Sequence, residues 1–226
     1  MLPLFAQKDR AGVDMELQPY TISGRESPLK RNLHFAGYKT HKFHHNTASW
    51  FSFGTLYIDN KILTLEGAPL HKTRSAGIFS FALKTDSGIV SRTEGRAVMQ
   101  KNVDYLEARI RTENDTTHVW YITAANLNVH NNAEQGGMIR CGDKEICFVK
   151  TTCMLRDEPV NRDDIKSLFT SLNLVYLFTY NDENIAAVNF TRQGKKFWCR
   201  DDLNSNIKTV VASAASLLCL RNDLYY

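Results

Sequence analysis

Between His34 and Leu155 the chain alternates short apolar runs with clusters of turn residues. The runs are rich in Phe, Tyr, Trp, Val, Ile and Thr, the residue types that favour β-strands. The dipeptides Asp59-Asn60, Gly142-Asp143 and Gln193-Gly194 suit hairpin turns, because their residues tolerate positive φ. Many strands joined in this way pair antiparallel and avoid exposed edges by closing. We therefore predict a mainly β protein, a closed antiparallel β-barrel of about 12 strands.

The pattern changes in the C-terminal segment from Ile207 to Leu220, which predicts a helix with Ser205 as its N-cap. The uncharged run Thr209 to Leu220 has a length of about 18 Å as a helix, less than the roughly 30 Å hydrocarbon core of a bilayer. A helix that is apolar nearly all round favours an environment of protein. We expect it in the centre of the barrel, whose wall side chains alone would not fill the interior. The alternative is a helix packed on the outside of an open sheet.

One further helix is predicted on the surface, over the residues Val160 to Asn173. Asn161 can cap it, and its apolar side chains recur at the spacing of one helical face. These side chains are Ile165, Leu168, Phe169 and Leu172.

Residues 1–30 contain three of the five prolines and little periodicity. We predict a loosely ordered lead-in there, with one strand between Met15 and Ser23. Residues 31–226 are then a single β-barrel domain.

Composition and charge narrow the class of protein. Hydrophobic residues make up 43% and charged residues 23% of the chain, values typical of a globular protein. The net charge of +4 is spread as short basic pairs, so no segment indicates nucleic-acid binding. The first residues lack the pattern of a secretory signal, which favours a cytoplasmic location, with peripheral attachment to a membrane as a further expectation. The five cysteines suit reduced core thiols better than disulfides.

The stretch from Lys195 to Tyr226 resembles the C-terminus of phospholipid scramblases. The shared features, in order, are an aromatic strand (Phe197, Trp198), a polar stretch with Leu203, the pair Ile207-Lys208, a run of small and apolar residues, and an aromatic end (Tyr225, Tyr226). With a many-stranded barrel before it, this order resembles the tubby-like domain superfamily, which also includes the LURP-one-related proteins. The resemblance implies a β-barrel that engages membranes or phosphoinositides and is not an enzyme.

The chain departs from scramblases at one functional segment. Scramblases carry an acidic calcium-binding stretch before the last helix. This sequence has Gln193, Gly194, Lys195 and Lys196 at the corresponding positions, which would repel a cation.

Basic residues near the predicted turns are the candidate binding surface for anionic lipids or a membrane surface. Near such a surface each cation contributes about 1 kcal/mol, so several converging ones would bind measurably. We expect no cofactor and no catalytic residue. Arg109 and Arg111 alternate on a predicted strand, so they face one side of it. The candidate ligand-binding residues are these two arginines together with the residues near turns, Lys39, Lys42, Lys72, Arg74, Lys195 and Lys196.

Three alternatives to this function remain open at this point. The first is a lipocalin-like barrel that holds a small hydrophobic ligand in an open cavity. The second is a protein-interaction or viral accessory domain. The third is a metalloenzyme with His41, His44 and His45 as ligands, although His41 and His45 would lie about 13 Å apart in a regular strand, too far to share one ion.

Overall fold

Residues 20–24, 32–48, 55–58, 61–64, 75–100, 103–125, 136–154, 172–191 and 194–222 are described in a computed structural model of the chain. The strands are β1 (Tyr20–Ile22), β2 (His34–Phe35), β3 (Tyr38–Ala48), β4 (Thr55–Ile58), β5 (Lys61–Thr64), β6 (Ser75–Thr85), β7 (Gly88–Gln100), β8 (Val103–Thr112), β9 (Asp115–Ala125), β10 (Gly136–Cys141), β11 (Lys144–Met154), β12 (Leu172–Tyr180), β13 (Glu183–Thr191) and β14 (Gly194–Cys199). The described helix is α2 (Ser205–Asn222).

Twelve of these strands form one sheet, in the order β1-β14-β13-β12-β11-β10-β9-β8-β7-β6-β3-β2, and β4 and β5 form a separate hairpin. The two outermost strands of this order meet at one point. The backbone groups of Ser23 and His34 exchange two hydrogen bonds of 2.9 Å there. The sheet is therefore a nearly closed antiparallel barrel, which confirms the predicted fold class.

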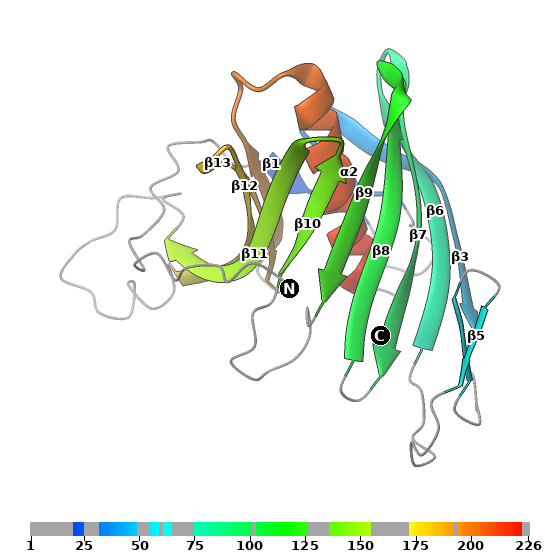
Figure 1. Cartoon of the computed structure of the whole chain (residues 1–226). Helices are drawn as coiled ribbons and strands as arrows, with labels where there is room; N and C mark the ends of the chain where they lie inside the picture. The colour runs from blue at the N-terminus through cyan, green and yellow to red at the C-terminus, as the bar shows by residue number, and fades with distance from the viewer. Residues whose placement is uncertain are drawn as a thin grey trace.

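Helix α2 runs inside this barrel. Figure 1 shows it between the two walls of the curved sheet, and it contacts β7, β8 and β9 on one wall and β13 on the other. Every residue from Thr209 to Leu220 is buried, so no side of this stretch faces water. The prediction of a central helix is confirmed, and the alternative of a helix outside an open sheet is wrong. No helix in the described part of the chain has both the length and the apolarity that crossing a bilayer requires.

The helix begins at the predicted place, but its cap is a different residue. The side-chain oxygen of Asn204 accepts a hydrogen bond of 2.8 Å from the backbone N–H of Asn206. The carbonyl of Asn204 accepts the first helical hydrogen bond, from the N–H of Lys208. These two roles define the N-cap, so Asn204 takes the position that we assigned to Ser205.

Two hydrogen bonds attach the inner wall to α2. The hydroxyl oxygens of Ser91 on β7 and Ser213 on α2 lie 2.7 Å apart in the core. The side chain of Tyr38 on β3 is hydrogen-bonded to Thr209, and burial raises the pKa of its phenol despite that bond. The walls formed by β3 and β7 are therefore fixed against the helix.

Of the three predicted turns, one lies wholly within the described residues and is confirmed. Gly142, with φ of +62°, and Asp143 connect β10 to β11. Asp59 and Asn60 lie outside the described residues, between Ile58 of β4 and Lys61 of β5, which pair with each other. In the third predicted turn, Gln193 lies outside the described residues, and Gly194 is the first residue of β14, where it pairs with Thr191.

Two other predictions fall partly or wholly outside the described residues. The strand expected between Met15 and Ser23 is present as β1, which pairs with β14. Most of the predicted surface helix, from Val160 to position 171, lies outside the described residues. Leu172 and Asn173, which we placed in that helix, are the first residues of β12.

Candidate functional site

The predicted basic residues lie on different parts of the barrel. Lys39 is near the start of β3, at the end of the barrel where α2 begins, and Lys195 and Lys196 are near the start of β14, at the opposite end. Lys72 and Arg74 are outside the described residues. The described candidates therefore do not gather at one rim.

Three lysines come together on the outer face of β3 and β6. Lys39 and Lys84 are directly opposite each other in the antiparallel pair of strands, which brings their Cβ atoms to about 5 Å. Lys42 follows on β3 and is exposed. We call Lys39, Lys42 and Lys84 the β3–β6 basic patch. Among the described residues, none of the three forms an ion pair with a carboxylate.

A β-bulge in β3 shapes this patch. The pairing register of β3 against β6 shifts between His41 and His44, and Lys42 has a φ of +52°, uncommon for a residue with a side chain. The extra residue lets Phe43 point into the core while His41 and His44 face outward, opposite Ala82 and Ser80. The segment from His41 to His44 therefore presents one lysine and two histidines on the outside and still supplies the ring of Phe43 to the core.

His41 lies within this patch. Partial removal from water, together with the charges of Lys84, Lys42 and Lys39, lowers the pKa of its imidazole below the ordinary value. The imidazole is therefore neutral at neutral pH, and the lysines carry the positive charge of the patch.

Arg109 and Arg111 differ from the lysines of the β3–β6 basic patch because both form ion pairs. They face the same side of β8, as their alternation predicts, and both are paired with one carboxylate. The Nη2 atom of Arg109 lies 2.8 Å from Oε2 of Glu94, and the Nη1 atom of Arg111 lies 3.5 Å from Oε1 of the same residue. One shared carboxylate offsets half of their combined charge.

The same face continues across the barrel as a row of directly opposite residues. Its members, from β7 to β11, are Glu94, Arg109, Tyr121, Arg140 and Glu145. The Nε atom of Arg140 lies 2.6 Å from Oε2 of Glu145, and the ring of Tyr121 is 58% exposed. Arginines in this row have carboxylate partners, unlike the lysines of the β3–β6 basic patch.

The hairpin tips at the end where α2 begins are acidic. Each described connection at this end, other than the β2–β3 turn, carries at least one exposed carboxylate. These residues are Asp86, Glu113, Asp143, Asp182, Asp201 and Asp202. The described connections at this rim are therefore acidic, in contrast to the basic loops that we expected, and Lys39, Lys42 and Lys84 lie on the strands β3 and β6.

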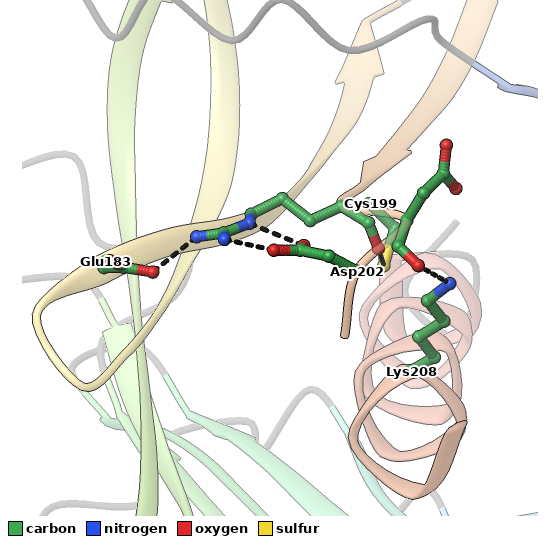
Figure 2. A network of polar contacts seen from close by, with 6 residues as sticks. Glu183, Cys199, Asp202 and Lys208 are labelled. Carbon is green, nitrogen blue, oxygen red and sulfur yellow. Dashed lines mark hydrogen bonds and ion pairs between the residues drawn. The ribbon is translucent and has the colours of Figure 1, made fainter. Parts of the chain in front are cut away.

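A network around Arg200 connects this rim to α2. Its Nε and Nη2 atoms lie 2.9 and 2.6 Å from the two carboxylate oxygens of Asp202, and its Nη1 atom contacts Glu183 on β13 (Figure 2). Lys208 on α2 donates to the carbonyl oxygen of Asp201. These carboxylates raise the pKa of Arg200, and Arg200 lowers the pKa of Asp202. The network holds the β14–α2 turn against the β12–β13 hairpin.

The described residues provide little for metal or acid–base chemistry. The bulge places His41 and His44 on one face, but the side chain of His45 lies outside the described residues. Among the described residues, no group of three possible metal ligands occurs. The Nδ1–H group of His118 donates a hydrogen bond to the carboxylate of Asp115, 2.9 Å away, and this bond lowers the pKa of the carboxyl. No described nucleophile contacts Nε2 of His118, so the pair lacks the third member of a catalytic triad.

Cysteine chemistry is also suppressed. Burial raises the pKa of both Cys147 and Cys199 to about 11, so both thiols are protonated at neutral pH. The described cysteines are free, in agreement with the prediction of reduced thiols.

Lys84 is the member of the patch that sequence reasoning missed. It is 45 positions from Lys39 along the chain, and the β4–β5 hairpin lies between their strands. Only the pairing of β3 with β6 shows that the two lysines are neighbours. A signal in the sequence was the position of Lys84 just before the Asp86-Ser87 turn, in the same class of position as the other candidates.

Comparison of the chain with protein-family models, with curated proteins and with solved structures gives no match.

Proposed function

We propose that this protein is a non-catalytic module that binds anionic lipid headgroups at a membrane surface through the β3–β6 basic patch. The observation that carries the proposal is the placement of Lys39 directly opposite Lys84, with no carboxylate partner for either among the residues that the structure describes. Like charges opposite each other in a sheet destabilise the fold. An anionic ligand that bridges them would remove this repulsion.

Two further features support this reading. The lysines are on a wall that hydrogen bonds fix to α2, so the charges are held in place before a ligand arrives, which lowers the entropic cost of binding. The space in which a lipocalin-like barrel would hold a ligand is occupied by α2. An outer surface is then the natural place for a ligand.

The resemblance to the tubby-like superfamily is part of the proposal. Its members engage membranes or phosphoinositides, and the cytoplasmic leaflet has the negative surface potential that attracts lysines. A peripheral position on that leaflet would present the β3–β6 wall to the membrane.

The test is sedimentation with vesicles that contain phosphatidylserine, at low salt. The triple variant Lys39→Gln, Lys42→Gln and Lys84→Gln should lose about 3 kcal/mol of binding, roughly a hundredfold in affinity, because each cation contributes about 1 kcal/mol. The matched control is Lys144→Gln, Lys195→Gln and Lys196→Gln, which removes the same charge elsewhere on the barrel. Equal losses in both variants, or no binding by the unaltered protein, would overturn the proposal.

A further inference from the structure

His41 lies among charged and titratable side chains that affect the protonation of its imidazole. The titratable and charged groups that face it from its own and neighbouring elements are Lys39, Lys42 and His44 on β3, His34 on β2, Lys84 on β6, Arg92 on β7 and Asp86 in the β6–β7 turn. Ala82 separates His41 from Arg92 in the sheet, and Arg92 is already paired with Glu113 at 3.2 Å. The lysines are therefore the charges that act most directly on His41.

We propose that His41 takes up a proton when the β3–β6 basic patch binds an anionic headgroup, so that binding strengthens as the pH falls from about 7.5 to about 5.5. This inference rests on the proposed function. It adds a regulation of that site by pH.

The reason is the reversal of the electrostatic environment on binding. In the free protein partial removal from water, followed by the charges of Lys84, Lys42 and Lys39, holds the pKa of His41 below its ordinary value of about 6.5, so the imidazole is neutral at neutral pH. An anion placed on the lysines cancels their repulsion and attracts the protonated imidazole, which raises the pKa.

Linkage fixes the sign of the effect on affinity. If a bound anion favours protonation of His41, protonation of His41 must favour the anion by the same factor. One added cation near an anionic surface corresponds to about a fivefold change in affinity. We therefore expect affinity to rise about fivefold between neutral and mildly acidic pH.

The test uses vesicles of phosphatidylcholine with phosphatidylglycerol, whose phosphodiester keeps one negative charge over this range. Binding of the unaltered protein should strengthen about fivefold on acidification from pH 7.5 to pH 5.5, whereas binding of His41→Gln should change little between these two pH values. His118→Gln is the matched control, because it removes an exposed histidine on β9, away from the patch. It should keep the full pH dependence.

The outcomes separate the two proposals. Absence of binding at both pH values would overturn the proposed function itself. Binding that does not strengthen on acidification, or that strengthens equally in His41→Gln, would overturn the role of His41 and leave the patch as a site. As a second readout, the NMR titration of the His41 imidazole should show a higher pKa with soluble short-chain phosphatidylglycerol than without it, and an unchanged pKa would contradict the inference.

Discussion

Two neighbouring regions of the outer wall use their cations in opposite ways. On β7 and β8, Glu94 is paired with both Arg109 and Arg111. On β3 and β6, Lys39 faces Lys84, and the described residues offer neither of them a carboxylate. The number of cations is similar, and the difference lies in which residue stands opposite each one.

This contrast separates charges that serve the fold from charges that are available to a ligand. Exposed ion pairs contribute little to folding, but they neutralise the side chains that form them. Like charges in opposite positions cost folding stability and leave a strong local potential. A count of Lys and Arg would not distinguish the arginines of β8 from the lysines of β3 and β6, whereas the register of the sheet does.

The strongest way to break the contrast is to make the patch resemble the paired region. Lys84→Glu would place a carboxylate opposite Lys39, and we expect about 2 kcal/mol weaker binding to anionic vesicles, roughly 30-fold, because the local charge changes by two. The same change should stabilise the fold by about 0.2–1 kcal/mol, since a repulsive cross-strand pair becomes attractive. Vesicle sedimentation and denaturant unfolding measure the two effects.

Lys84→Gln is the control for this variant, with about half the loss of binding. A variant Lys84→Glu that is less stable than the unaltered protein would show that the two lysines do not repel each other in the fold.

The same distinction between partnered and unpartnered groups exists inside the barrel. The hydroxyl of Ser213 is bonded to that of Ser91, whereas the buried hydroxyl of Ser216, one turn further along α2, has no hydrogen-bond partner in the described part of the chain. Ser213→Ala should cost about 1–2 kcal/mol of unfolding free energy, because it leaves Ser91 buried with one partner fewer. Ser216→Ala should be neutral or stabilising. Urea unfolding of both variants checks this, and equal losses would contradict it.

The core of this fold was predictable because its signals are local. The uncharged run from Thr209 to Leu220 is apolar on every face, and only a position surrounded by protein satisfies such a helix. Short β-rich runs with turn residues between them likewise indicate hairpins that close on one another. The cap at Asn204 was missed because Asn204 and Ser205 are adjacent and both have good capping side chains.

The site was less predictable because it depends on distant pairings. Lys39 was identified from its own surroundings, but the partner that makes it significant is Lys84, on a strand that follows the inserted β4–β5 hairpin. The bulge between His41 and His44 also escaped prediction, since a regular strand would have placed these two side chains on opposite faces. Register and bulges are properties of the whole sheet, and no single segment specifies them.

A change in the paired region should produce the opposite effect to a change in the patch. Glu94→Gln leaves Arg109 and Arg111 without their shared carboxylate, so we expect binding to anionic vesicles to strengthen by about 1 kcal/mol, roughly fivefold. The fold should lose less than about 1 kcal/mol, because the ion pairs are exposed. Glu107→Gln serves as a comparison, since its partner Arg96 is a single, less exposed cation. Unchanged binding by Glu94→Gln would show that the β8 arginines do not face the membrane.

The smallest expected effect is a change in how folding stability depends on pH when the ion pair between Arg200 and Asp202 is removed. Arg200 lowers the pKa of Asp202 below its ordinary value near 4, so the ion pair stabilises the fold above that pH and this contribution is lost only as the pH falls further, through the lowered pKa. His41 changes charge at higher pH, which separates the two events. Thermal unfolding should therefore show that Asp202→Asn loses less stability than the unaltered protein as the pH falls from about 5 to about 2.5. The affinity of Asp202→Asn for vesicles should equal that of the unaltered protein at both pH 7.5 and pH 5.5. If its unfolding followed the same pH dependence as that of the unaltered protein, the Arg200 network would not stabilise the β14–α2 turn, and the acid response would have to arise elsewhere in the barrel.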